Sequence, residues 1–180
     1  LLTDRLAQTM VASNRSGRYS ALMFMDLDNF KSLNDTHGHY VGDLLLIEVA
    51  HRISSCVREV DVVARFGGDE FVVILSELDP DETESIKQTA SVAEKIRAVL
   101  AKPYVLKLMQ TGKAEASIEH HCTASIGVVV FINHLESQDH ILKWADAAMY
   151  QAKHTGGNAI RFYEPKTPLP QRALAKIGTH

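Results

Sequence analysis

The feature that most constrains this fold is a pair of short apolar runs joined by a turn of two glycines and two acids. Residues 60–66 and 71–75 are rich in Val, Ile and Phe, and the segment Gly67-Gly68-Asp69-Glu70 connects them. Runs of this length and composition around a glycine turn predict a β-hairpin. Adjacent carboxylates at the tip indicate either a ligand site or an exposed turn that is acidic for solubility. The hairpin alone leaves both interpretations open.

Apolar patterning in the rest of the chain predicts further strands and helices. Strands are expected at residues 19–26, 104–108, 116–119, 122–131 and 159–163, the second and third forming a side hairpin around Thr111-Gly112. Helices are expected at residues 3–14, 40–58, 82–102 and 138–154, with a short helical turn after the first strand. Because sequence-adjacent strands interrupt the alternation, we expect an α+β (mixed α/β) fold: a mixed sheet flanked by helices, not a doubly wound parallel sheet.

Helical spacing also predicts which residues lie in the core. Val11 is expected on the buried face of the first helix, which Thr3 or Asp4 would cap. Ile86 is expected to begin the buried stripe of the helix that starts near residue 82.

Composition excludes several classes of protein. The 180 residues suit one domain with a sizeable core, and the net charge of −3 argues against general binding to nucleic acid or anionic membranes. Cys56 and Cys122 lack metal-site spacing and are expected to be reduced thiols in a cytoplasmic protein. We expect no membrane segment, because no apolar run is long enough to span a bilayer, and no signal peptide opens the chain.

Acidic residues stand at the ends of two predicted strands. Asp26 closes the strand at 19–26, and Asp69 and Glu70 occupy the hairpin tip. If that strand lies beside the hairpin, these carboxylates and the Leu27 carbonyl converge on one sheet edge, where they suit Mg²⁺ or Mn²⁺ and phosphoryl or nucleotidyl transfer. The alternative is a set of solvated turn acids.

Other familiar sites are not supported. The chain has no G-x-x-x-x-G-K-[ST] loop and no G-x-G-x-x-G after a strand. The histidine groups His37-x-His39 and His120-His121 lack a third ligand at a spacing that suits zinc.

The residues themselves resemble a known family. Residues 65–71, Arg-Phe-Gly-Gly-Asp-Glu-Phe, are similar to the signature of GGDEF domains, the diguanylate cyclases. The family's other motifs have counterparts in the same order, at residues 25–35 (D-x-D-x-F-K-x-x-N-D), 38–43, 123–127 and 145–153. The resemblance covers residues 19 to 162.

This resemblance implies a fold like that of nucleotide cyclases and polymerase palm domains, with a five-stranded mixed core sheet and the GGDEF hairpin at its active edge. It implies condensation of two GTP molecules into cyclic di-GMP and pyrophosphate by a homodimer. Asp26, the Leu27 carbonyl, Asp69 and Glu70 would bind two Mg²⁺ or Mn²⁺ ions per active site. Glu70 would assist the metals or deprotonate the 3′-hydroxyl.

The resemblance also implies the residues that hold the substrate. Lys31 would steady transition-state charge, and Gly67 and Gly68 would admit the phosphates close to the backbone. Asn34 and Asp43 would read guanine, since an amide donates to O6 and a carboxylate accepts from N1–H and the amine. Without the family they are a loop polar residue and a helix-start acid. The substrate-binding set is completed by Phe30 and Lys153.

Arg58-x-x-Asp61 resembles the family's inhibitory site for the product, cyclic di-GMP. Arginine suits bidentate contact with phosphate or guanine. The competing interpretation is a helix-terminal Arg beside an Asp that opens a strand.

Two departures from the family concern activity and extent. Gly157 stands where the family has an arginine that contacts the triphosphate, so weaker GTP binding is expected, or else a non-enzymatic module that binds GTP or cyclic di-GMP for signalling. The L-T-G-L-x-N-R block that opens the family's first helix is absent. We therefore expect a GGDEF domain over residues 1–163 without its N-terminal segment, then a linker or tail at 164–180, with sensory or phosphodiesterase domains elsewhere in the full protein.

Overall fold

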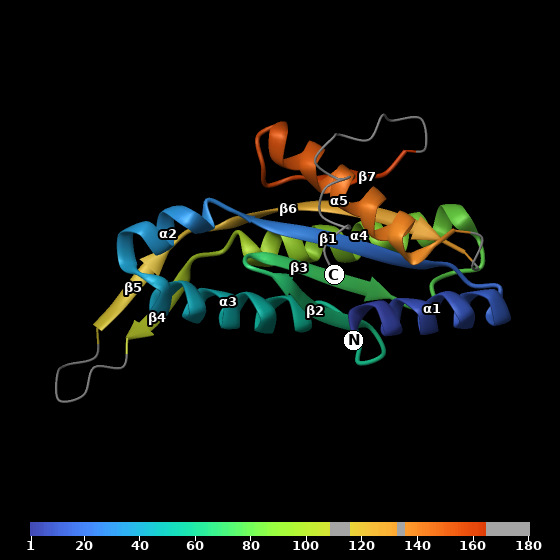
Figure 1. Ribbon diagram of the computed structural model, residues 1–180, viewed down its shortest axis with the longest axis horizontal. Coiled ribbons are helices and arrows are strands. Elements are labelled where there is room, and N and C mark those ends of the chain that lie inside the picture. Colours follow the sequence, from blue (N-terminus) through green and yellow to red (C-terminus); the bar gives the residue numbers. More distant parts are fainter. Residues whose placement is uncertain (109–115, 133–135, 165–180) are drawn as a thin grey trace.

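A computed structural model of the protein describes residues 1–108, 116–132 and 136–164 (Figure 1). The predicted turn at Thr111-Gly112 and the predicted tail lie outside these residues. In chain order, the elements are α1 (Leu2–Ser16), β1 (Ser20–Asp28), α2 (Phe30–His37), α3 (His39–Ser54), β2 (Val62–Gly67), β3 (Glu70–Leu75), α4 (Glu82–Leu100), β4 (Tyr104–Leu108), β5 (Ala116–His120), β6 (Thr123–Phe131), α5 (Gln138–His154) and β7 (Ile160–Phe162).

Five strands form the central sheet in the order β2-β3-β1-β6-β7. Strand β1 is antiparallel to both β3 and β6, and β7 is parallel to β6. The predicted α+β fold with a five-stranded mixed sheet is confirmed. The second hairpin, β4–β5, forms a separate two-stranded sheet. A strand with a neighbour on each side and helices over both faces must be apolar at successive positions, which explains the uninterrupted apolar run of β1.

Helices cover both faces of this sheet (Figure 1). Met23 and Met25 of β1 belong to the core cluster beneath α3 and α4, whereas Leu22 and Phe24 belong to the cluster beneath α1 and α5. Successive side chains of a strand point to opposite faces, so one strand supplies both cores.

The structure corrects several sequence predictions. Val11 and Ile86 are 55% and 40% exposed, and no side chain caps α1. Helix α3 ends at Ser54 rather than near residue 58. In α4, the buried stripe begins one residue before Ile86, at Ser85, whose hydroxyl donates to the Glu82 carbonyl at 2.7 Å. An internal hydrogen bond of this kind lets a small polar residue occupy a core position that apolar spacing assigns to its neighbour.

Among the residues that the structure describes, no helix combines the length and apolar character needed to cross a membrane.

Candidate active site

The paired strands β1 and β3 bring the predicted acidic residues together. Asp26 near the end of β1 lies opposite Glu70 at the start of β3, and the Leu27 amide donates to the Asp69 carbonyl at 3.2 Å. Antiparallel pairing produces this meeting, because it places the carboxyl end of one strand beside the amino end of the next. The convergence expected from the strand ends is therefore present.

The hairpin tip is held by the Arg65 side chain and leaves open space beside its two glycines. Gly68 has a φ of +51°, a conformation that favours glycine, and the Gly68 carbonyl accepts a 2.8 Å hydrogen bond from Nε of Arg65. A Cβ atom added at Gly67 or Gly68 would meet no atom within 4 Å. The space over the two glycines is free for another molecule to approach the backbone.

A lysine from a distant helix completes this edge. Lys153 in the last turn of α5 contacts the Asp26 carboxylate through its ammonium group. Burial raises the pKa of Asp26 above its ordinary value, and the hydrogen bond from Lys153 opposes that rise. The charge of Asp69 raises the pKa further, so Asp26 and Asp69 are close enough to repel one another.

Within the described ranges, no group of three His, Cys, Asp or Glu side chains converges tightly enough to hold a metal ion. Asp26 and Asp69 still offer two carboxylates with a backbone carbonyl nearby. Mg²⁺ is commonly bound by one or two carboxylates, with substrate phosphates and water as its other ligands. The residues present therefore fit a cation that arrives with a phosphorylated substrate.

The predicted guanine-reading residues lie on α2 and α3. Asn34 packs against Gly42, where an added Cβ would stand 1.9 Å from the Asn34 Oδ1 atom and 3.2 Å from Cζ of Phe30. That Oδ1 atom is buried without a hydrogen-bond partner. A buried acceptor without a partner is costly, and a donor group of a ligand would complete it. The Nδ2 group of the same amide is the donor that guanine O6 requires.

Asp43 follows Gly42 directly and is exposed. It lines a cavity of about 580 Å³ between α3 and β2, whose other lining residues include Arg65 and Phe71 of the hairpin. The exposed Lys31 stands on the first turn of α2, which begins two residues after β1 ends. Asp43 and Lys31 are therefore exposed on helices that border the sheet edge formed by Asp26, Asp69 and Glu70, here called the acidic edge.

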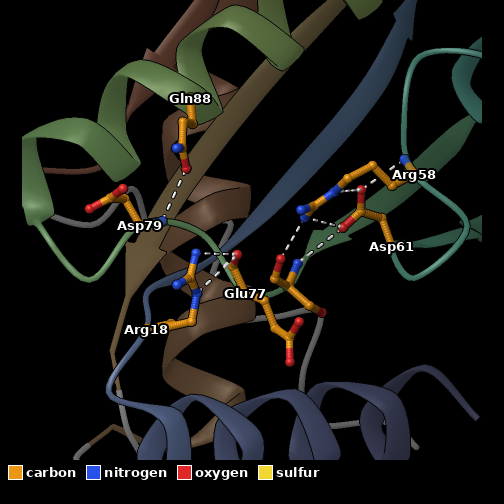
Figure 2. A network of polar contacts seen from close by, with 7 residues as sticks. Arg18, Arg58, Asp61, Glu77, Asp79 and Gln88 are labelled. Carbon is orange, nitrogen blue, oxygen red and sulfur yellow. Dashed lines mark hydrogen bonds and ion pairs between the residues drawn. The ribbon is translucent and has the colours of Figure 1, made fainter.

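The predicted inhibitory pair lies near the opposite end of β3, where the chain leaves that strand (Figure 2). Nε of Arg58 donates to Asp61 Oδ2 at 3.1 Å and Nη2 donates to Oδ1 at 2.9 Å, while Oδ1 also accepts from the Ser76 amide. The hydrogen bond to Asp61 raises the pKa of Arg58. Six residues of strand at about 3.3 Å each separate the two ends of β3 by roughly 17 Å, so this pair and the acidic edge are separate sites.

Beside that pair is a cavity of about 560 Å³. Arg58 and Asp61 line it together with Arg18, whose guanidinium donates to the Glu77 carbonyl, and with Lys87 and Gln88 of α4. In Figure 2, Arg18 extends from the segment between α1 and β1, and Arg58 from the segment between α3 and β2. The lining is mixed in charge, because Asp61 and Glu77 stand beside the two arginines and Lys87. The guanidinium groups are the part of it that suits an anionic ligand.

Sequence reasoning missed one carboxylate at the active edge. Asp28, two residues after Asp26 in β1, accepts hydrogen bonds from Thr123 and Ser125 of β6. Because Asp28 is two residues from Asp26, both side chains lie on one face of the strand. That spacing is the sequence signal that could have identified Asp28 as a residue of this edge.

The mixed sheet, the acidic strand ends and the amide on α2 are those expected of an α+β domain with a nucleotide-cyclase-like fold. A family model described as "Diguanylate cyclase, GGDEF domain" matches residues 1–159. The chain belongs to this GGDEF family.

Individual relatives agree with this membership. Over 164 residues, 91% of this chain, it is 42% identical to the bifunctional diguanylate cyclase/cyclic di-GMP phosphodiesterase MucR of Pseudomonas aeruginosa, but it spans only 22% of MucR. The crystal structure of the GGDEF domain of TpbB (YfiN) from P. aeruginosa superposes with a TM-score of 0.76 at 32% identity, covering 91% of this chain and 93% of that one. The GGDEF domain of DgcB from Caulobacter crescentus, in complex with c-di-GMP, gives 0.76 at 29% identity over 91% and 86% of the two chains.

Proposed function

We propose that this domain is a catalytically competent diguanylate cyclase that condenses two GTP molecules into one cyclic di-GMP and two pyrophosphates. The observation that carries the proposal is the meeting of Asp26 with Asp69 and Glu70 at one sheet edge, beneath two glycines whose outer face is open. Each GGDEF domain has one such edge. Two domains must therefore face one another, each with one GTP, so a homodimer forms at least transiently.

The reaction is a double nucleotidyl transfer. The 3′-oxygen of one GTP forms a bond to the α-phosphorus of the other, the bond from that phosphorus to the bridging oxygen breaks, and pyrophosphate leaves with the electron pair. Glu70 takes the hydroxyl proton or assists at the metal site. Lys31 balances the charge that grows on the phosphate oxygens, and Gly67 and Gly68 admit the α- and β-phosphates to the backbone.

Two Mg²⁺ or Mn²⁺ ions, held by Asp26, the Leu27 carbonyl, Asp69 and Glu70, would supply charge neutralisation and alignment of the reacting oxygens. In their absence, Lys153 pairs with Asp26 and keeps that buried carboxylate compensated. A cation held by the Asp26 carboxylate would leave the Lys153 ammonium available to contact the triphosphate.

Selectivity for guanine is assigned to Asn34 and Asp43. The amide donates to O6, and the carboxylate accepts from N1–H and the exocyclic amine. Adenine presents the opposite polarity at these atoms and would leave both protein groups unpaired, so ATP is rejected. Phe30 packs beside Asn34 against Gly42 and supports its position.

Product inhibition is assigned to Arg58 and Asp61. Their cavity offers Arg18, Arg58 and Lys87 to the two phosphates of a cyclic dinucleotide, and it is separate from the acidic edge. Cyclic di-GMP therefore binds there without competing for the GTP site. In the cell the domain would act in the cytoplasm, joined to sensory or phosphodiesterase domains of a longer protein.

The alternative is a signalling module that binds GTP or cyclic di-GMP without catalysis, and Gly157 in place of the expected arginine favours it. Incubation with GTP and Mg²⁺ over a series of protein concentrations, followed by quantification of cyclic di-GMP, separates the two. We expect product whose rate per domain rises with concentration, and none from Asp69→Asn. The control is Asp139→Asn, the same change at an exposed position of α5. Bound GTP with no product at the highest concentration would establish the alternative.

A further inference from the structure

Asp28 is used differently from Asp26, although both stand on the same face of β1. Its Oδ2 accepts from the Thr123 hydroxyl at 2.6 Å and from the Asn158 amide at 2.9 Å, and its Oδ1 accepts from the Ser125 hydroxyl at 2.8 Å. Three donors from β6 and from the segment after α5 therefore surround one carboxylate. These bonds make Asp28 a fixed junction between three segments of the chain.

The segment that Asp28 holds is a turn in an uncommon conformation. Gly156, Gly157 and Asn158 have φ values of +115°, +71° and +47°. Of the backbone amides in this turn, that of Asn158 donates to the Asp28 carboxylate, and that of Gly157 donates back to α5. On the other side, Arg97 of α4 donates to the Asn158 side-chain oxygen at 2.7 Å. The turn is therefore held from β1 and from α4.

The same turn fixes the end of α5. The Gly157 amide donates to the Ala152 carbonyl at 3.1 Å, and the Thr155 hydroxyl donates to the Gln151 carbonyl at 3.0 Å. Lys153, whose ammonium contacts Asp26, lies between these bonded positions. A displacement of the turn would therefore move Lys153 relative to the acidic edge.

We infer that Asp28 is a positioning residue for GTP binding: by holding the 156–158 turn, it sets the place of the Lys153 ammonium. This inference rests on the proposed function, in which Lys153 contacts the triphosphate. The role assigned to Asp28 is indirect, since three of its acceptor sites already hold donors from β6 and from the turn.

The same contact limits which side chains position 157 can hold in this chain. A Cβ atom there would lie 3.0 Å from Asp28 Oδ2 and 3.1 Å from Cγ and Oδ1, at a φ that strains any other residue. Restoring the family's arginine with Gly157→Arg is therefore expected to displace Asp28 and weaken GTP binding rather than strengthen it.

The test is a double-mutant cycle of Asp28→Ala and Lys153→Ala, with the GTP dissociation constant measured by calorimetry in the presence of Mg²⁺. Each single change is expected to weaken GTP binding about tenfold, the effect of losing one charge-assisted contact. The double variant is expected to bind GTP no more weakly than either single variant. If the two changes act independently, so that the double variant loses the product of the two single losses in GTP affinity, the inference is overturned. Asp28→Asn is the conservative variant: an amide turned to accept from Thr123 and Asn158 still holds the turn, so most of the affinity should return. If Asn is as harmful as Ala, Asp28 acts through its charge and the positioning role is wrong.

A second readout follows the turn directly. Hydrogen exchange of the amides at 156–158 is expected to accelerate in Asp28→Ala, while the exposed control Asp4→Asn leaves it unchanged. Should Asp28→Ala fail to unfold cooperatively, Arg97→Ala releases the turn from its other side and is expected to speed the same amides. Faster exchange in that variant with unchanged GTP affinity would show that the turn does not set the place of Lys153, and would refute the inference.

The outcomes separate this inference from the proposed enzyme. Wild-type protein that makes cyclic di-GMP but shows multiplying effects refutes the positioning role alone. If the wild-type protein binds GTP but makes no product, the proposed enzyme activity is refuted, and the double-mutant cycle can still be measured by GTP binding. Wild-type protein that does not bind GTP refutes both.

Discussion

Two glycines that both lack room for a side chain should differ in how much stability they lose on substitution by alanine. At Gly42 the added Cβ meets the end of a side chain, the Asn34 Oδ1 atom at 1.9 Å. At Gly127 of β6 it meets backbone, the Ala145 carbonyl oxygen at 2.0 Å and the Met149 amide nitrogen at 2.2 Å. A side chain can rotate away, whereas two backbone segments packed in a core cannot separate without moving α5 from the sheet.

The magnitudes follow from these neighbours. For Gly42→Ala, about 1 kcal/mol gained from helix propensity offsets part of the cost of moving Asn34, so the free energy of unfolding changes by about 1 kcal/mol or less. The displaced amide no longer reaches guanine, and loss of that hydrogen bond weakens GTP binding by about tenfold. For Gly127→Ala, overpacking against backbone lowers the free energy of unfolding by about 3 kcal/mol or more, which at about 3 °C per kcal/mol lowers Tm by about 9 °C.

Urea denaturation and GTP calorimetry on both variants measure these quantities. The pair controls itself, because the chemical change is identical and only the neighbour differs. Gly42→Ala that binds GTP as the wild type does would show that Asn34 does not read the base from its place beside Gly42. Gly127→Ala of unchanged stability would contradict the steric argument itself.

Three further predictions concern charge and reactivity. Burial raises the pKa of Asp26 in the folded, metal-free protein. Between the unfolded and folded pKa values the folded state binds one proton more, so the free energy of unfolding should fall as pH rises through that window. Urea denaturation from pH 4 to 7 should show a flatter pH dependence for Asp26→Asn. Arg58→Ala should abolish inhibition by added cyclic di-GMP while leaving the initial rate unchanged, and inhibition that persists would place the product elsewhere. Burial raises the pKa of the Cys122 thiol to about 12, so iodoacetamide at pH 8 should leave it unmodified in folded protein and alkylate it in urea, as mass spectrometry would detect.

Local sequence signals predicted the elements of the fold because their causes are local. The apolar run of β1, the glycine turn of the hairpin and the Pro103 stop after α4 each act over a few residues. Where a side chain could satisfy itself internally, the same signals failed: Ser85 took the core position that spacing assigned to Ile86.

The sequence by itself determined the type of fold and the identity of the acidic hairpin, since strand periodicity and turn chemistry depend on near neighbours. Only the tertiary structure decided how distant groups are used. Lys153 reaches Asp26 across 127 positions, and the Asn158 amide reaches Asp28 across 130. Such pairs depend on strand register and on how α5 packs over the sheet, which no short stretch of sequence encodes. For that reason two aspartates spaced two apart in β1 look equivalent in sequence, yet one pairs with a lysine at the acidic edge and the other anchors a turn.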